Sequence, residues 1–262
     1  MGWGRRLQFP LLVLAMAPAG HAAAESVSLA SASRTCTGET RVRVVSSLLQ
    51  PGSVGQEQAS AMGETVSVRR VGDQFEIRRS FSVPGGEAVL IAHIRPNGTV
   101  IDANVTGGLP GVASDQLRQM SSLAARTLPE RLILGRAFHP GDNLYADLDP
   151  QELVANMVGA MAVPPGFQFQ LSGGIPFAGM IGDGASRALN FAGDLRTTGS
   201  GQANGHTMAM TFPARVTMTI DAASGLMRSL LTEGTMELKL DGVTQMQMHL
   251  RQDLTCTIVP AA

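Results

Sequence analysis

Aromatic residues are scarce in this sequence, and basic residues are not in excess. The only tryptophan is Trp3 and the only tyrosine is Tyr145. Proteins that bind sugars or single-stranded nucleic acids usually stack them on several aromatic rings, so both ligand classes are disfavoured. Lysine and arginine together number 20, against 21 aspartates and glutamates. No positive charge therefore draws the chain to nucleic acid or to anionic lipid, and we expect no nucleic-acid partner.

Catalytic and cofactor motifs are also missing. The sequence contains no G-x-S-x-G elbow, no H-E-x-x-H and no P-loop, and its glycine-rich segment 172–185 lacks the G-x-G-x-x-G of dinucleotide-binding proteins. Beyond the first 24 residues the histidines are scattered: His93, His139, His206 and His249. Nothing in the sequence places a serine or an aspartate beside one of them. We expect no catalytic residue and no cofactor.

Two metal sites are alternatives. Thioethers and imidazole bind Cu(I), and His206 lies on one predicted strand face with Met208 and Met210. Asp142, Asp147 and Asp149 lie close in sequence and suit Ca²⁺ or a glycosidase, although their spacing is not that of an EF-hand. Methionine is also the usual filler of irregular cores, and Asp149 suits a helix cap. We therefore predict no metal site.

The first 24 residues have the pattern of a secretory signal peptide. Arg5 and Arg6 precede a short apolar stretch, and the small residues Ala22–Ala24 follow it, with cleavage expected after Ala24. The apolar stretch is too short to span a bilayer. Lys239 is the sole lysine, so almost all basic residues are arginine, as in GC-rich bacterial genomes. We predict a periplasmic protein that does not span the membrane and has one β-rich domain, residues 25–262.

The two cysteines, Cys36 and Cys256, lie near opposite ends of the chain. In an oxidising compartment such a pair is expected to form a disulfide, worth about 4–5 kcal/mol for so long a loop. The alternative is a metal or redox pair, but the C-x-x-C spacing is absent. Each cysteine falls on the apolar face of its strand. If the first and last strands pair, the bond lies inside and ties the ends of the sheet together.

Short apolar runs punctuated by glycine and proline predict antiparallel β-structure. Alternation is clearest at 74–83, at the last strand, residues 246–258, and at 208–220, where every second residue is apolar. We also expect strands at 34–49, 64–71 and 187–195, and a hairpin of 87–95 with 99–106 around Pro96-Asn97-Gly98. Two helices interrupt them, one at 115–128 ended by Pro129 and one beginning after Asp149.

We predict a mainly β (α+β) fold, a strongly curved antiparallel sheet or partial barrel with the two helices against its concave side. A concave apolar face suits an apolar ligand, and flexible methionines suit its lining. The apolar glycine-rich segment 172–185 is either a lid over such a cavity or a loop that covers the core. The predicted ligand-binding residues come from both regions: Met208, Met210, Phe212, Met246, Met248, Phe177 and Met180.

Two segments carry a resemblance to a known family. These are the hairpin Thr217–Leu226, especially Ile220-Asp221-Ala222-Ala223-Ser224-Gly225-Leu226, and Phe138-His139-Pro140-Gly141-Asp142 leading into a strand. Together with a signal peptide, they resemble the LolA-type and LppX-type lipoprotein carriers. The resemblance implies an apolar cavity for acyl chains.

Three functions are compatible with these patterns. The leading hypothesis is a non-enzymatic periplasmic binding module for a lipid or other apolar ligand. The second is a structural or interaction protein of the cell envelope, with a solid core and an envelope protein as its partner. The third is a hydrolase of unknown class.

Overall fold

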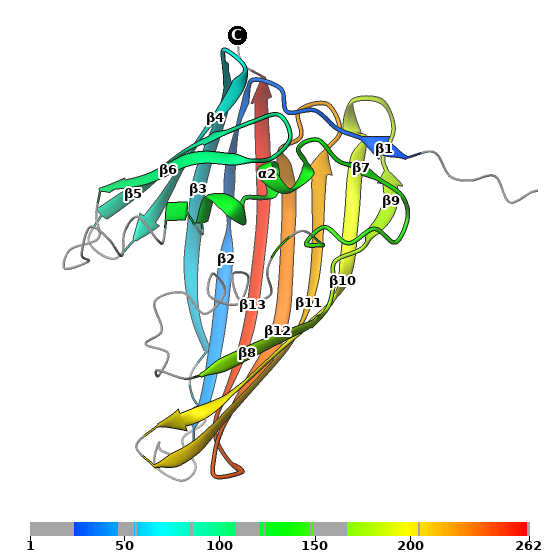
Figure 1. Ribbon diagram of the computed structural model, residues 1–262. Helices are drawn as coiled ribbons and strands as arrows, with labels where there is room; N and C mark the ends of the chain where they lie inside the picture. The colour runs from blue at the N-terminus through cyan, green and yellow to red at the C-terminus, as the bar shows by residue number, and fades with distance from the viewer. Residues whose placement is uncertain are drawn as a thin grey trace, which may run out of the picture.

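The computed structural model is mainly antiparallel β-sheet (Figure 1). It describes residues 24–46, 55, 57–83, 86–107, 121–122, 124–146, 148, 167–203 and 205–260. The long strands are β2 (Ala32–Ser46), β3 (Glu57–Val71), β4 (Gln74–Val83), β5 (Gly86–Ile94), β6 (Val100–Gly107), β10 (Ala188–Ala203), β11 (His206–Asp221), β12 (Met227–Leu240) and β13 (Val243–Pro260). The short elements are β1 (Glu25–Ser26), α2 (Pro129–Ile133), β7 (Ala137–Phe138), β8 (Gln168–Gly173), β9 (Phe177–Ile181) and the 3₁₀ turn η1 (Gly184–Ser186).

Two meanders form one sheet of eleven strands. Its order is β6-β5-β4-β3-β2-β13-β12-β11-β10-β8, with β9 also paired to β10. The first meander runs from β2 to β6 and the second from β8 to β13. They meet where β2 pairs with β13, so the first and last long strands are neighbours. The two-residue strands β1 and β7 pair separately.

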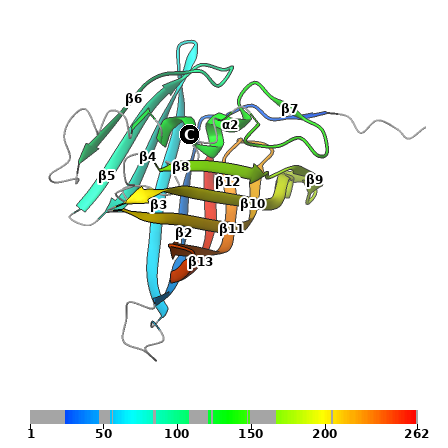
Figure 2. The ribbon, with the colours of Figure 1, turned by 60° about the horizontal axis from the view of Figure 1, so that its bottom comes forward.

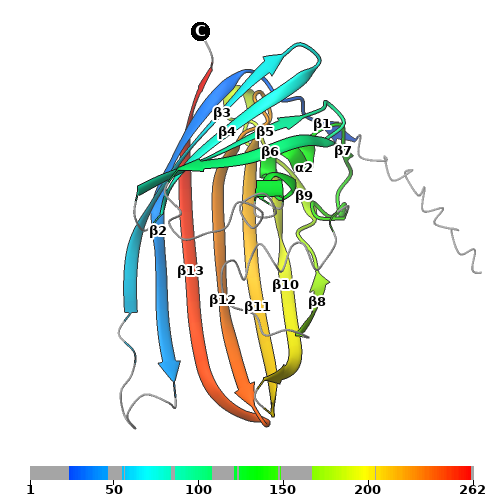
Figure 3. The same ribbon diagram turned by 60° about the vertical axis from the view of Figure 1, so that its left-hand side comes forward.

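The sheet is strongly curled but not closed. Strands β4, β5 and β6 turn away from the long strands at one end, and β8 lies across the sheet from them (Figures 2 and 3). The two outer strands, β6 and β8, do not pair with each other. The predicted mainly β, antiparallel architecture is confirmed, and the described part of the sheet remains open.

Alternation in sequence explains the strands. In β4, Phe75 and Ile77 are buried while Arg78 is exposed, as a period of two requires. The predicted hairpin of β5 and β6 is confirmed, and Gly98 in its turn has a φ of 81°, which favours glycine. Most predicted strands exist but extend further than the pattern indicated, as β3 and β10 show.

The disulfide between Cys36 and Cys256 is present and joins directly paired residues of β2 and β13. Their Cα atoms are 3.9 Å apart. Cys36 is fully buried, as its apolar strand face indicates. The prediction that the bond ties the ends of the sheet is wrong. Although β2 and β13 are the terminal long strands in sequence, they lie in the middle of the sheet, so the bond fastens the seam between the two meanders.

The helical prediction is partly correct. Residues 121–122 and 124–126 are helical, and Leu128 has left the helix, as expected before a proline. Pro129, however, also begins the helix α2, because its fixed φ suits the first helical position. The helix predicted after Asp149 lies outside the described residues. The placement of two helices against the concave side therefore stays a prediction.

The main core fills one end of the curl. Leu132 and Ile133 of α2 belong to the same buried cluster as Val66 and Ile77 of the sheet. Three phenylalanines from β7, β9 and β10 pack beside them, with ring centroids 5.1–6.1 Å apart: Phe138, Phe177 and Phe191. This end of the inner face is therefore solidly packed.

Candidate functional site

The inner face of the sheet, defined as the face that carries Cys36, changes character along the strands. Along β11 the even-numbered residues face inward. Ala214, Val216, Met218 and Ile220 are buried, and the last three belong to the main core. Further along the same face, only Met210 is buried, and Met208 and Phe212 are half-buried. The row of apolar residues at 208–220 is thus buried in the main core at one end and only partly buried at the other.

A second apolar cluster occupies this other end of the inner face. We call it the Met/Phe cluster: Phe169, Met210 and Met236, with Phe167, Leu171, Phe212, Leu238, Met246 and Met248 packed against them. Its members come from four strands or their flanks, β8, β11, β12 and β13. Only Phe169, Met210 and Met236 are buried; the others are half-buried. The cluster therefore keeps apolar surface that is not fully packed.

Glycines form the floor under the aromatic rings of the cluster. A Cβ atom at Gly199 would lie 2.3 Å from Cε1 of Phe167 and 2.9 Å from Cδ1 of Phe169. A Cβ atom at Gly234 would lie 2.9 Å from Cε2 of Phe212. Because real Cβ contacts are longer than this, the rings can lie against the backbone only where the side chain is missing. The glycines thus set the depth of the cluster.

Polar residues separate the two apolar regions on the central strands. Thr232, Gln252, Thr40 and Ser60 are directly paired in this order across β12, β13, β2 and β3. We call them the polar row. Nε2 of Gln252 donates to Sδ of Met62 at 3.3 Å, and Met62 is 37% exposed. The Met/Phe cluster therefore has a polar boundary on the side of the main core.

On β10 the boundary is a single threonine. Thr197 is 2% exposed and is directly paired with Leu171 on one side and with Phe212 on the other. Its Oγ1 atom is buried and has no hydrogen-bond partner among the residues that the structure describes. Buried hydroxyls almost always have a partner, because leaving one unpaired costs free energy. The Thr197 hydroxyl is therefore an unsatisfied hydrogen-bonding group at the boundary between the two apolar regions.

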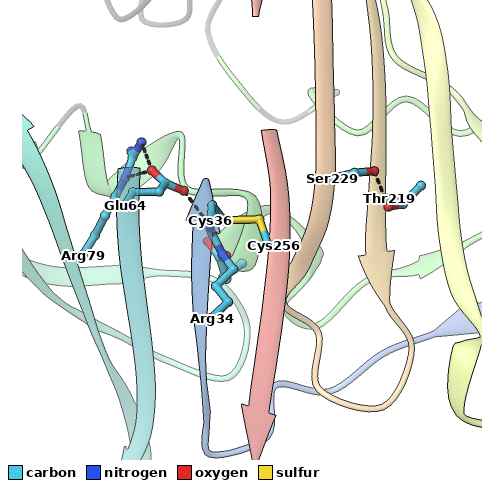
Figure 4. Close-up of a disulfide and its surroundings, with 8 residues drawn as sticks. Arg34, Cys36, Glu64, Arg79, Thr219, Ser229 and Cys256 are labelled. Atoms are coloured by element: carbon cyan, nitrogen blue, oxygen red, sulfur yellow. Dashed lines mark hydrogen bonds and ion pairs between the residues drawn. A yellow bond between two sulfur atoms is a disulfide. The ribbon is translucent and has the colours of Figure 1, made fainter. Parts of the chain in front are cut away.

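A buried ionic chain lies beside the disulfide (Figure 4). Nε of Arg34 donates to Oε1 of Glu130 at 2.7 Å, and Nη1 contacts Glu64. Glu64 also accepts from Nε of Arg79 at 2.7 Å. Nη1 of Arg34 lies 2.6 Å from Sγ of Cys36. The chain links α2, β2, β3 and β4, and its charges alternate.

Two groups of this chain, Arg34 and Glu64, are held in their charged forms by their neighbours. Burial acts to lower the pKa of Arg34, but Glu130 and Glu64 outweigh it and raise the pKa above its ordinary value. Burial acts to raise the pKa of Glu64, but Arg79 and Arg34 outweigh it and lower the pKa. The charged forms of Arg34 and Glu64 are therefore favoured, which fits a structural link better than an acid–base catalyst.

The structure brings together four of the predicted ligand-binding residues. Met210, Phe212, Met246 and Met248 all belong to the Met/Phe cluster, and Met208 lies on the same face of β11. Phe177 and Met180 lie elsewhere, against the main core. The glycine-rich segment that contains them is partly strand β9, paired with β10, and its Ile175 and Phe177 are buried in that core. It therefore covers the core.

Sequence reasoning missed several members of the two sites. Phe167, Phe169 and Leu171 alternate in the sequence, which was a usable signal for β8. Met236 and Leu238 also alternate on β12. In the ionic chain, Arg79 interrupts the alternation of β4, and the structure explains this break because its side chain pairs with Glu64. Nothing local in the sequence indicates that Glu130 pairs with Arg34, 96 residues away.

Two grooves lie on the opposite, outer face. One of about 340 Å³ is lined by residues that include Asp194, Arg196 and Arg215. The other, of about 350 Å³, is lined by Glu39, Arg41, Arg251 and Asp253. The first groove also has apolar lining residues, among them Leu195 and Pro213. In the second, each arginine pairs with an acid of its own strand. The second groove is lined by charged residues alone and does not resemble a site for an apolar ligand.

The two metal alternatives concern His206 on β11 and the acids around Asp142. In the described part of the chain, no group of three or more histidine, cysteine, aspartate or glutamate side chains is arranged to hold a metal ion. His206 pairs with Asp241 at 2.7 Å and is exposed. Asp142 accepts a hydrogen bond from the backbone of His139 in a turn, while Asp147 and Asp149 lie outside the described residues.

Comparisons with known proteins give few relatives. No family model matches the chain, and no curated protein matches it. Solved structures that match include Neisserial surface protein A, with 8% identity, a TM-score of 0.21, and coverage of 87% of this chain and 97% of that one. Another is Ail, the attachment invasion locus protein of Yersinia pestis, with 7% identity, a TM-score of 0.18, and coverage of 87% and 100%.

These matches overturn the expected family resemblance. Neither of these two structures is a LolA-type or LppX-type carrier, and the assignment drawn from the hairpin Thr217–Leu226 and from Phe138–Asp142 is wrong. Each segment ends in a turn. In the first, Asp221 accepts hydrogen bonds from the backbone and the hydroxyl of Ser224, which is common turn chemistry. Turn chemistry recurs in unrelated folds and does not identify a family.

Two further findings concern location. Among the described residues, no helix is both long enough and apolar enough to cross a membrane. The disulfide is consistent with an exported protein, because such bonds persist in oxidising compartments. Residues 1–23, which carry the expected signal peptide, lie outside the described part of the chain.

Proposed function

We propose that the chain is an exported, periplasmic binding module whose Met/Phe cluster holds the apolar part of a lipid or another apolar ligand. Its signal peptide would be cleaved near Ala24. The observation that carries the proposal is the unequal packing of one sheet face, solid at one end and half-buried at the other. Residues such as Met246 and Met248 keep apolar surface beside the buried Met210 and Phe169.

The composition of the cluster supports this proposal. Methionine side chains are unbranched and flexible, so they adapt to ligands of varying shape. The ring centroids of Phe167 and Phe169 are 4.9 Å apart, and both rings lie against the backbone at Gly199. These rings add a rigid aromatic surface to the cluster. Binding sites for apolar molecules are typically lined in this way, with few polar groups.

The first prediction introduces a charge into the cluster. We expect Met248→Glu to weaken binding of a fluorescent fatty-acyl probe at least about 10-fold, because a carboxylate is poorly solvated against apolar side chains and one methionine's apolar contact is lost. The protein is first stripped of co-purified lipid and binding is measured by fluorescence titration. Circular dichroism of each variant checks the fold.

The matched control is Val243→Glu. Val243 is 61% exposed near the turn between β12 and β13, so the same carboxylate there stays in water. We expect this variant to bind the probe within about twofold of the wild type. Failure of the wild type to bind any acyl probe, or equal binding by the Met248 variant, would contradict the proposed function.

A second function has one observation in its favour. The end of the inner face around Phe138 and Phe191 is solid core, and the two described grooves lie on the charged outer face. This arrangement favours an envelope protein that acts through its outer surface. Two results together would support that alternative. The lipid-free wild type would bind no acyl probe yet retain a specific partner, and the outer-face variant Arg251→Glu would fail to retain that partner.

A further inference from the structure

Thr197 has an unusual position for a hydroxyl. It is 2% exposed on the inner face of β10, and within the described part of the chain its Oγ1 atom has no hydrogen-bond partner. Valine has nearly the same shape and is also favoured in strands, so it would fill this place without an unpaired polar atom. The hydroxyl therefore adds nothing to the packing of the protein alone.

The neighbours of Thr197 place it at the inner boundary of the Met/Phe cluster. On β10 the next inward residues are Leu195, buried in the main core, and Gly199, which lies under Phe167 and Phe169. Across the sheet it is paired with Leu171 and Phe212, and both of these pack against the Met/Phe cluster. The hydroxyl thus lies beneath the edge of the Met/Phe cluster that is nearest to the main core.

The side chains around Thr197 favour an uncharged hydrogen-bond partner for its hydroxyl. The inward-facing neighbours that flank Thr197 carry no charge: Leu171, Leu195, Gly199, Phe212 and Ala214. A phosphate or a carboxylate at this depth would have no counter-ion and would be costly to desolvate. A neutral carbonyl oxygen needs only one donor, and a threonine hydroxyl supplies one.

We propose that the hydroxyl of Thr197 donates a hydrogen bond to the ester carbonyl of an acyl lipid whose chain lies over the Met/Phe cluster. This inference rests on the proposed function and specifies its ligand class. The half-buried Phe212 is the side chain that shifts to admit the carbonyl, since it is paired directly with Thr197. Specificity at this point then comes from one hydrogen bond, and affinity comes from the apolar contact.

The test compares two phosphatidylcholines of equal chain length, one with ester-linked and one with ether-linked chains. Only the first has a carbonyl. Titration of the delipidated full chain is expected to give about 3- to 10-fold tighter binding of the ester lipid, which is the range for one hydrogen bond. Thr197→Val is expected to bind the ether lipid as the wild type does and to lose the preference, whereas Thr197→Ser keeps it.

Infrared spectroscopy gives a second, direct readout. With ¹³C-labelled ester carbonyls, binding to the wild type is expected to lower the carbonyl stretching frequency, and binding to Thr197→Val is not. Equal affinity for both lipids, or a preference that survives in Thr197→Val, overturns this inference and leaves the proposed function standing. Absence of binding by either lipid overturns the proposed function and this inference with it.

Discussion

Arg34 shows how one residue can join distant parts of this chain. Its guanidinium is 1% exposed and contacts Glu130 of α2, Glu64 of β3 and the sulfur of Cys36. A buried charge is tolerated only when it is paired and hydrogen-bonded, so these contacts depend on one another. Arg34 lies two residues before Cys36, so the period of two places it inward, but the sequence does not reveal its partners.

Glu64 is the central acid of the ionic chain, and Glu64→Gln removes the charge that both Arg34 and Arg79 face. Two arginines are then left without their shared partner, one of them buried. We expect the free energy of unfolding at pH 7 to fall by about 3–5 kcal/mol, measured by urea denaturation. The control Glu233→Gln removes an acid that is 61% exposed, and it should change stability by less than about 1 kcal/mol.

The same residue makes stability depend on pH. Because the folded pKa of Glu64 is lowered from 4.5, its contribution is fully present above that pH and is lost as the pH falls through the folded pKa. The wild type should therefore lose stability on acidification below about pH 4.5 more steeply than Glu64→Gln. Parallel acid limbs for the two proteins would contradict this role.

At the scale of elements, the seam between β2 and β13 is the structural centre. The disulfide and the inward faces of both strands follow from alternation around Cys36 and Cys256, and the sequence was sufficient to predict them. Their place in the middle of the sheet was not predictable, because it depends on how two separate meanders order themselves. Likewise, Pro129 marks the end of one helix, but its role in beginning α2 depends on packing.

Removal of the disulfide tests the seam. The double variant Cys36→Ala and Cys256→Ala releases a loop with a sequence separation of 220. The chain-entropy model predicts that the free energy of unfolding falls by about 4–5 kcal/mol. Urea denaturation measures this loss, and dithiothreitol should destabilise the wild type but not the variant. A loss below about 1 kcal/mol would mean that the strand pairing alone holds the seam.

At the scale of the whole molecule, a single curled sheet presents one inner face whose two ends are packed differently. The end near α2 is packed solid, and the Met/Phe cluster at the other end is half-buried. The sequence predicted the strands and four of the cluster's residues, because alternation is a local property. It did not separate Phe177 and Met180 from them, because whether an apolar residue is core or surface depends on which segments cover it.

The family resemblance failed for a related reason. Segments such as Asp221–Gly225 report a turn, and turns are decided within a few residues, whereas curvature and strand order arise from contacts across the whole chain. The proposed function therefore depends on the inner face itself and not on kinship.

The most direct test of the Met/Phe cluster is photo-crosslinking with a fatty-acyl ester that carries a diazirine along its chain. After irradiation of the delipidated wild type, peptide mass spectrometry locates the labels. We predict labels on the inward residues of β8, β12 and β13, such as Phe169, Met236 and Met248, with competition by unlabelled acyl lipid. Labels confined to the outer face around Arg41 and Arg251, or labelling that unlabelled lipid does not reduce, would contradict the assignment of this cluster as the binding site.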